Sequence, residues 1–121
     1  MPTEPQHLDK ALHNRRIATG LGADPTDHTA TGWALTVLFY SALHYIEAFN
    51  SRTNFHGHTH QQVNDQVRRN PVLEAIKYDY RDLQNFSWNA RYDTTRYSQQ
   101  HLDEALQFHE NIRRHVQALL T

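Results

Sequence analysis

The sequence predicts an all-α fold, an antiparallel bundle of four to five helices. Apolar residues recur every three or four positions over segments much longer than an ordinary strand. Four glycines and four prolines in 121 residues are few, which favours long regular elements over a loop-rich sheet. A chain of this length forms one core, so we expect a single domain over residues 1–121.

The first helix and its turn occupy residues 1–27. In "QHLDKALHNRRIA" the apolar side chains fall on one side of a helix, which Gly20 and Gly22 bring to an end. The following "ADPTDHT" has the composition of a turn, and Asp27 is suited to cap the next helix. We therefore expect a helix, a turn and a second helix start within this segment.

The segment from about 29 to 50 is apolar on two faces. One row consists of Leu35, Leu38, Phe39, Ala42, Ile46 and Phe49, and the other of Ala34, Val37, Ser41, Tyr45 and Ala48. A helix that is apolar on nearly all sides lies in the middle of a bundle. This segment is the predicted central helix.

Two later segments carry a single apolar seam each. A short polar helix, "HQQVNDQVRRN", precedes Pro71, which opens the next helix at its first turn. The two seams consist of Leu73, Ile76, Tyr80, Leu83, Ser87 and Ala90, and of Leu102, Ala105, His109, Ile112, Val116 and Leu119. This spacing is typical of helices packed in a bundle. His109 interrupts the second seam, and Tyr80 is the hydrogen-bond partner we expect for it.

Composition narrows the functional classes. The chain has no cysteine, so disulfides and thiolate metal ligands are excluded. Twelve basic and 13 acidic residues give a formal charge of −1, whereas protonation of all ten histidines would give +9, so affinity for phosphates should rise as the pH falls. The longest apolar stretch contains Thr36, Ser41, His44 and Glu47, and "MPTEPQHLDK" lacks the features of a signal peptide. We expect a cytoplasmic protein without a membrane partner.

Two stretches, "FYSALHYIEAF" followed by a histidine-bearing loop and "YDYRDLQNFSWNARYDT" followed by a closing helix, resemble the HEPN superfamily. The core of the resemblance spans residues 28–121. It implies a HEPN-like helical bundle that forms a homodimer, for which Phe86, Trp88 and Tyr92 are available. The family includes RNA-cleaving toxins of toxin–antitoxin and defence systems, RNA-processing factors, and non-catalytic nucleotide-binding or interaction modules. RNA or a nucleotide, and a cognate nucleotidyltransferase or antitoxin, are the partners that the resemblance implies.

Active members of this family carry an arginine followed four to six residues later by a histidine. "RYSQQH" supplies Arg96 and His101, although Tyr97 stands where an Asn, Asp or His is usual, and "RTNFHGH" supplies Arg52 and His58. In the metal-independent cleavage that the resemblance implies, the histidine moves a proton at the ribose 2′-OH or the leaving 5′ oxygen and the arginine neutralises the phosphate. Arg96 and His101 are the predicted catalytic residues, and a solvated helix start is the alternative.

Arg91 and Tyr92 form a second pair near Arg96. An arginine and a tyrosine in this position suit a nucleotide phosphate and base stacking, respectively, so we expect them to bind nucleotide or phosphate. A network at the end of a helix is the alternative.

A third class of function is a metal-binding bundle enzyme. "NFHGHTHQQ" places His56 and His60 four residues apart, and His44 and Glu47 have the i, i+3 spacing of ligands in bundle metal sites. Together they could hold zinc or iron with one open position. The other interpretation is that His44 forms a hydrogen bond inside the bundle and that the loop histidines are exposed. We expect no metal and no cofactor.

Overall fold

A computed structural model describes residues 2–53, 59–94 and 96–121. Within these ranges it contains five α-helices, one 3-10 helix and no strand. The elements in order are α1 (Glu4–Leu21), α2 (His28–Arg52), α3 (His60–Arg69), η1 (Pro71–Ile76), α4 (Lys77–Tyr92) and α5 (Gln99–Leu120). The prediction of an all-α fold is confirmed.

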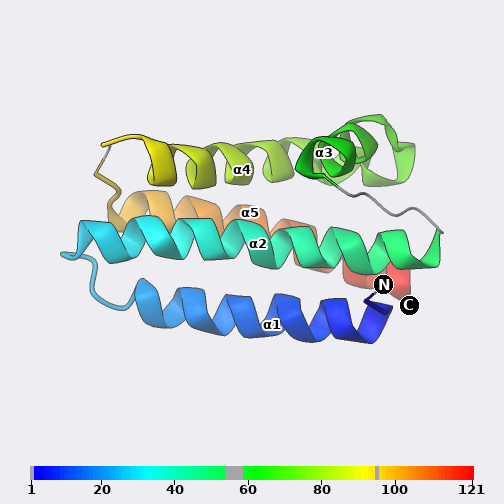
Figure 1. The fold of residues 1–121 in the computed structure, drawn as a ribbon, viewed down its shortest axis with the longest axis horizontal. Coiled ribbons are helices and arrows are strands. Elements are labelled where there is room, and N and C mark those ends of the chain that lie inside the picture. Colours follow the sequence, from blue (N-terminus) through cyan, green and yellow to red (C-terminus); the bar gives the residue numbers. More distant parts are fainter. Residues whose placement is uncertain (1, 54–58, 95) are drawn as a thin grey trace.

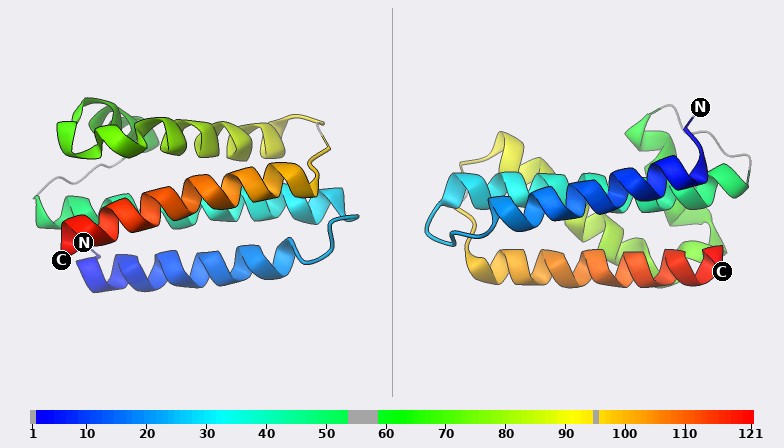
Figure 2. Two further views of the ribbon diagram at one scale, coloured as in Figure 1. Left: turned by 180° about the vertical axis from the view of Figure 1, so that it is seen from behind. Right: turned by 90° about the horizontal axis from the view of Figure 1, so that it is seen from below.

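The four long helices lie side by side along the long axis of the molecule. Figure 1 shows α2 in the middle, with α1 on one side and α4 on the other, and the chain runs in opposite directions in successive long helices. Figure 2 shows from two further sides that α5 also lies along α2. The α1–α2 turn and the α4–α5 connection therefore lie at the same end of the bundle, opposite the chain termini.

The central position of α2 follows from its two apolar faces. It packs against α1, α4 and α5, and its side chains Leu35, Leu38, Phe39 and Ile46 are completely buried. Each such side chain contributes roughly 1.5–3 kcal/mol through removal from water. Asp27 is the N-cap, as predicted, because its side chain accepts a hydrogen bond from the Ala30 amide.

The predicted seams of the last two long helices are buried against α2. Five of the six predicted positions in each seam are buried, and the sixth, Ala90 or Leu119, is partly buried against the core. The segment after Pro71 begins as the 3-10 helix η1 rather than as an α-helix, with the Asn70 side chain accepting a hydrogen bond from the Val72 amide. Gly32 of α2 lies opposite Ala90, and this pair of small residues brings α2 and α4 close together at the end of α4.

The prediction that Tyr80 is the partner of His109 is wrong. Nε2 of His109 lies 2.8 Å from the Ser41 hydroxyl, which itself donates a 2.6 Å hydrogen bond to the carbonyl of Ala11. Tyr80 instead packs against the ring of Phe39, with centroids 5.5 Å apart. Both seams pack against α2, so His109 and Tyr80 each meet a residue of α2 rather than one another.

The hydrogen bonds around Ser41 also fix the tautomer of His109. The Ser41 hydroxyl uses its hydrogen on Ala11, so it accepts from His109 and the proton of the ring is on Nε2. Nδ1 of His109 is buried and has no hydrogen-bond partner among the described residues. Burial, with a smaller effect of Arg15, lowers the pKa of His109 to about 4.

No helix in the part of the chain that the structure describes combines the length and apolarity needed to cross a membrane.

Candidate functional site

A cavity of about 740 Å³ lies where the α1–α2 turn meets the end of α4 and the α4–α5 connection. One wall consists of residues 26–29, 32 and 33, and the other of residues 90, 91, 93, 94, 96 and 97. The two walls come from segments about 60 positions apart in the sequence. The antiparallel course of α1, α2, α4 and α5 brings them together at one end of the bundle (Figure 1).

The first wall is the N-terminus of the 25-residue helix α2. Asp27 caps it through the 3.0 Å hydrogen bond from the Ala30 amide, and His28 is its first helical residue. Unpaired amides and the positive end of the helix dipole favour an anion at such a terminus. Trp33, one turn further along, lines the same wall and is 53% exposed.

Arg91 reaches the cavity from the last turn of α4. Its Nε donates to the Ser87 carbonyl at 3.3 Å, and its Nη1 donates to the Tyr40 hydroxyl at the same distance. The guanidinium carbon lies 5.9 Å from the ring centre of Tyr40 and 5.3 Å from that of Tyr92. These contacts hold a cation at the cavity wall, and no ion pair joins it to a carboxylate in the part of the chain that the structure describes, so its charge can act on a ligand.

Arg96 is exposed and lines the cavity from the α4–α5 connection. Among the described residues it has no hydrogen bond or ion pair. The two acidic residues of the cavity both have backbone partners: Asp27 accepts from the Ala30 amide and Asp93 from the Thr94 amide at 2.7 Å. The cavity thus contains two arginines and two carboxylates that already accept hydrogen bonds.

The structure adds His28 and Trp33 to the site, and neither was predicted. Nδ1 of His28 lies 2.8 Å from the Tyr97 carbonyl oxygen, which can only accept, so Nδ1 carries the proton. This hydrogen bond also ties the α4–α5 connection to the start of α2. One signal was present in the sequence: Trp33 belongs to neither apolar row of α2. Nothing in the sequence indicates that His28 meets residue 97.

His101, the predicted partner of Arg96, does not line the cavity. It lies in the first turn of α5, where its Nδ1 accepts from the Ser98 amide at 3.1 Å and lies 3.0 Å from the Ser98 hydroxyl. The ring packs edge-on against Phe86 and Tyr97, with centroids 6.1 and 5.2 Å away. No hydrogen bond joins His101 to Arg96 in the described part of the chain, so the structure places the histidine in a capping box.

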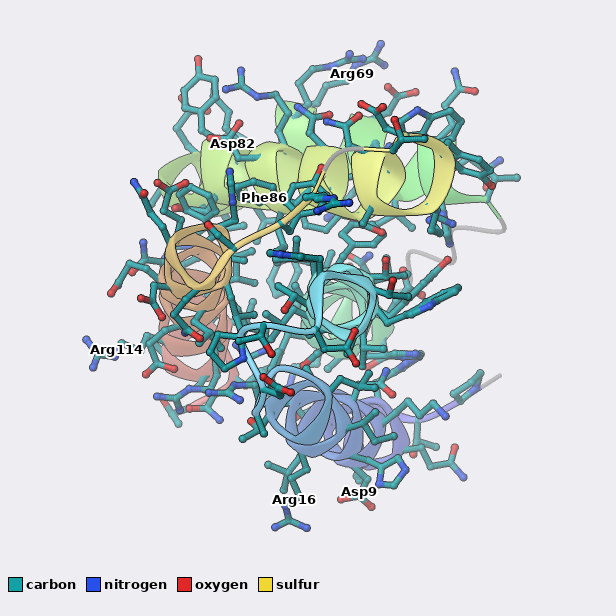
Figure 3. The ribbon with its side chains drawn as sticks, turned by 90° about the vertical axis from the view of Figure 1, so that its left-hand side faces the viewer. Asp9, Arg16, Arg69, Asp82, Phe86 and Arg114 are labelled. Atoms are coloured by element: carbon teal, nitrogen blue, oxygen red, sulfur yellow. The ribbon has the colours of Figure 1, made fainter. Side chains whose placement is uncertain are left out.

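The predicted aromatic residues of the dimer face have different positions. Phe86 is half-buried against Phe108, Tyr97 and His101 and thus belongs to the core of the single chain. Figure 3 shows its side chain at the junction of α4 and α5. Part of Phe86 is covered within the chain because it packs against Phe108 of α5, and its place in a dimer face stays a prediction. Trp88 is 58% exposed and Tyr92 is 67% exposed, and the centroids of their rings lie 4.5 Å apart.

The residues of the alternative metal site do not assemble among the described residues. Nδ1 of His44 lies 3.1 Å from Nδ1 of His7. His44 therefore forms a hydrogen bond inside the bundle, which was the other interpretation of this residue. Burial, followed by His7 and Lys10, lowers the pKa of His44 to about 4. His60 packs against Phe39 and Tyr40.

Glu47 is half-buried, and His56 lies outside the described residues. No group of three His, Cys, Asp or Glu residues in residues 2–53, 59–94 and 96–121 could hold a metal ion. Of the other predicted pair, Arg52 is bound by both carboxylate oxygens of Glu4, and His58 lies outside the described residues.

No model of a known protein family, no curated protein and no solved structure matches this chain.

Proposed function

We propose that the chain is a HEPN-like, RNA-directed protein that binds RNA phosphates in the cavity between α2 and the α4–α5 connection. One observation carries the proposal: Arg91 and Arg96 line the same cavity as the N-terminus of α2 and the exposed Trp33. The resemblance of "FYSALH" and "ARYD" to the HEPN superfamily supports RNA as the ligand.

The chemistry of the cavity suits a phosphate next to a base. A guanidinium group makes two parallel hydrogen bonds to phosphate oxygens, and a helix N-terminus adds amide donors. A stacked aromatic residue adds roughly 1–3 kcal/mol per base regardless of base identity. Arg91 and Arg96 can therefore hold the phosphate while Trp33 stacks on a base of single-stranded RNA.

Cleavage is the second part of the proposal. Arg96 would neutralise the charge that develops on the phosphate, and His101 would move a proton, as in the pair that the family resemblance implies. The 2′-OH is the nucleophile, the product is a 2′,3′-cyclic phosphate, and no metal takes part. Two copies of the chain would form the active unit, with Trp88 and Tyr92 at their interface, in the cytoplasm.

A non-catalytic module is the second candidate function, and the capping role of His101 favours it. A histidine whose Nδ1 already accepts from the Ser98 amide has one nitrogen fewer for proton transfer. Such a module would bind RNA or a nucleotide through Arg91 and Arg96 without cleaving it. A cognate nucleotidyltransferase or antitoxin would be its partner.

The experiment that tests RNA binding compares variants with equal changes of charge. Arg91→Gln and Arg96→Gln should each weaken the binding of a labelled single-stranded RNA roughly tenfold, since each removes charge-assisted hydrogen bonds. Arg16→Gln is the matched control because Arg16 points away from the bundle on α1 (Figure 3). Equal affinity of all four proteins at 0.1 M salt would disprove the proposed site.

A further inference from the structure

We infer that His28 is the proton-accepting catalytic residue of this cavity. The inference rests on the RNA-cleaving function proposed above and adds a residue from a different helix to the predicted Arg96–His101 pair. It is carried by the contact between His28 and the α4–α5 connection together with the position of both arginines around the same cavity.

The hydrogen bond to the Tyr97 carbonyl fixes the tautomer of His28. The carbonyl of Tyr97 accepts from Nδ1 of His28 at 2.8 Å, which leaves the lone pair of the neutral ring on Nε2. A hydrogen bond from Nδ1 to a backbone carbonyl is a general means of fixing the ring orientation of an active histidine. His28 is exposed and lines the cavity, so substrate can reach the ring.

Four other histidines, His44, His101, His109 and His115, are less suited to accept a proton at this cavity. Nδ1 of His101 accepts from the Ser98 amide, so its neutral ring has its hydrogen on Nε2 and is suited to donate rather than to accept. His109 is buried and His44 is partly buried, and their pKa values are lowered to about 4. His115 also donates to a carbonyl, that of Val72 at 2.7 Å, but it lies near the C-terminal end of α5 and away from the cavity.

The proposed step is a transesterification within the RNA. Nε2 of His28 takes the proton of a ribose 2′-OH, and the 2′ oxygen forms a bond to the adjacent phosphorus. The bond between phosphorus and the 5′ oxygen breaks, and this oxygen takes a proton from water. His28 then releases its proton to solvent, so the products are a 2′,3′-cyclic phosphate and a free 5′-hydroxyl. Arg91 and Arg96 stabilise the charge on the phosphate, and His101, whose ring hydrogen is on Nε2, can supply the proton of the 5′ oxygen in place of water.

The experiment uses three substitutions of the full chain. His28→Asn keeps an amide donor near the position of Nδ1, and so can still bind the Tyr97 carbonyl, but it has no basic nitrogen. His28→Ala removes both the hydrogen-bond donor and the basic nitrogen. His115→Gln is the matched control, since it alters another histidine that donates to a carbonyl. Cleavage is measured with a single-stranded RNA, and binding with an oligonucleotide of the same sequence that lacks 2′-hydroxyl groups.

We expect His28→Asn to lower the cleavage rate at least about 100-fold, the usual range for a lost proton acceptor, with binding of the 2′-deoxy oligonucleotide unchanged within about twofold. His115→Gln should retain the wild-type rate. A His28→Asn variant that cleaves RNA at the wild-type rate, or a wild-type protein that binds RNA without cleaving it, would overturn the inference while leaving the proposed binding site intact. Loss of binding in the arginine variants is a separate result and tests only the proposed function.

Discussion

His109 in the core and His28 at the cavity each use one ring nitrogen for a hydrogen bond to a protein oxygen, yet their surroundings differ. His109 is 1% exposed, its second nitrogen has no hydrogen-bond partner within residues 2–53, 59–94 and 96–121, and its pKa is lowered to about 4. His28 is exposed and lies in a cavity with two arginines. The same side chain therefore serves packing in one place and is available to a ligand in the other.

The regions in which His109 and His28 lie differ in the same way. The interface of α1 with α2 and α5 holds three histidines, His7, His44 and His109, whose pKa values are all lowered, chiefly by burial. The cavity holds charged groups that remain in contact with water. Protonation should therefore destabilise the fold through the first region, whereas ligand binding should depend on the second.

The largest effect is expected on the rate of RNA cleavage, in the variants Arg96→Ala and His101→Ala. If the two residues act together on one phosphate, each substitution should lower the rate about 100-fold or more, and the double variant little further, because groups that act as a unit are not additive. Cleavage should persist in EDTA and should leave a 2′,3′-cyclic phosphate, both measurable with an end-labelled RNA. Equal residual cleavage in wild type and all three variants would exclude this pair.

The next effect concerns the stability of the buried region at acid pH. The folded-state pKa of His109, about 4, lies below the ordinary value of about 6.5, so the unfolded chain takes up the proton first as the pH falls. The stability that neutral His109 contributes is fully present above about pH 6.5 and is lost as the pH falls toward 4. For His109 alone the loss between pH 7 and pH 5 is roughly 2 kcal/mol, and His44 and His7 act in the same direction.

Urea unfolding at pH 7, 6 and 5 measures this loss. A free energy of unfolding that is constant between pH 7 and pH 5 would contradict the assignment of these three histidines to a region withdrawn from water.

The substitution His109→Leu tests whether His109 serves only packing in the core. Leucine removes a buried nitrogen that lacks a hydrogen-bond partner, while the Ser41 hydroxyl keeps its hydrogen bond to the Ala11 carbonyl. We expect a change in stability at pH 7 of less than about 1.5 kcal/mol, of either sign, and the loss of the roughly 2 kcal/mol acid dependence. A destabilisation of more than about 3 kcal/mol at pH 7 would show that His109 has a role beyond packing.

The sequence predicted the helices well because apolar periodicity reports burial directly. The two rows of α2 and the seams of α4 and α5 mark the buried faces, and Asp27 is the N-cap. Contacts between helices were harder to predict, because a single seam does not show which neighbouring helix it faces. Tyr80 was therefore wrongly expected opposite His109. Phe86 was expected to be available to a partner chain, but it packs against Phe108 of α5.

The candidate site was predicted on one side only. Arg91 and Arg96 lie close in sequence and follow a recognisable motif, and the structure places both at the cavity. His28 and Trp33 come from the other wall, which meets the first only because α1, α2, α4 and α5 bring two chain connections to one end of the bundle. Contacts between residues so far apart in the sequence depend on the packed fold, and local patterns do not contain them.

The smallest effect separates the two roles of His101. Ser98 and His101 form a capping box at the start of α5, in which the ring takes the position usually held by Glu or Gln. His101→Ala removes the acceptor of the Ser98 amide and should lower the free energy of unfolding by about 0.5–1 kcal/mol. His101→Gln supplies an amide oxygen in the same position and should restore most of that loss without supplying an imidazole. Urea unfolding of both variants, beside the cleavage assay, distinguishes the roles: recovery of stability and cleavage together in His101→Gln would mean that His101 acts only as a helix cap.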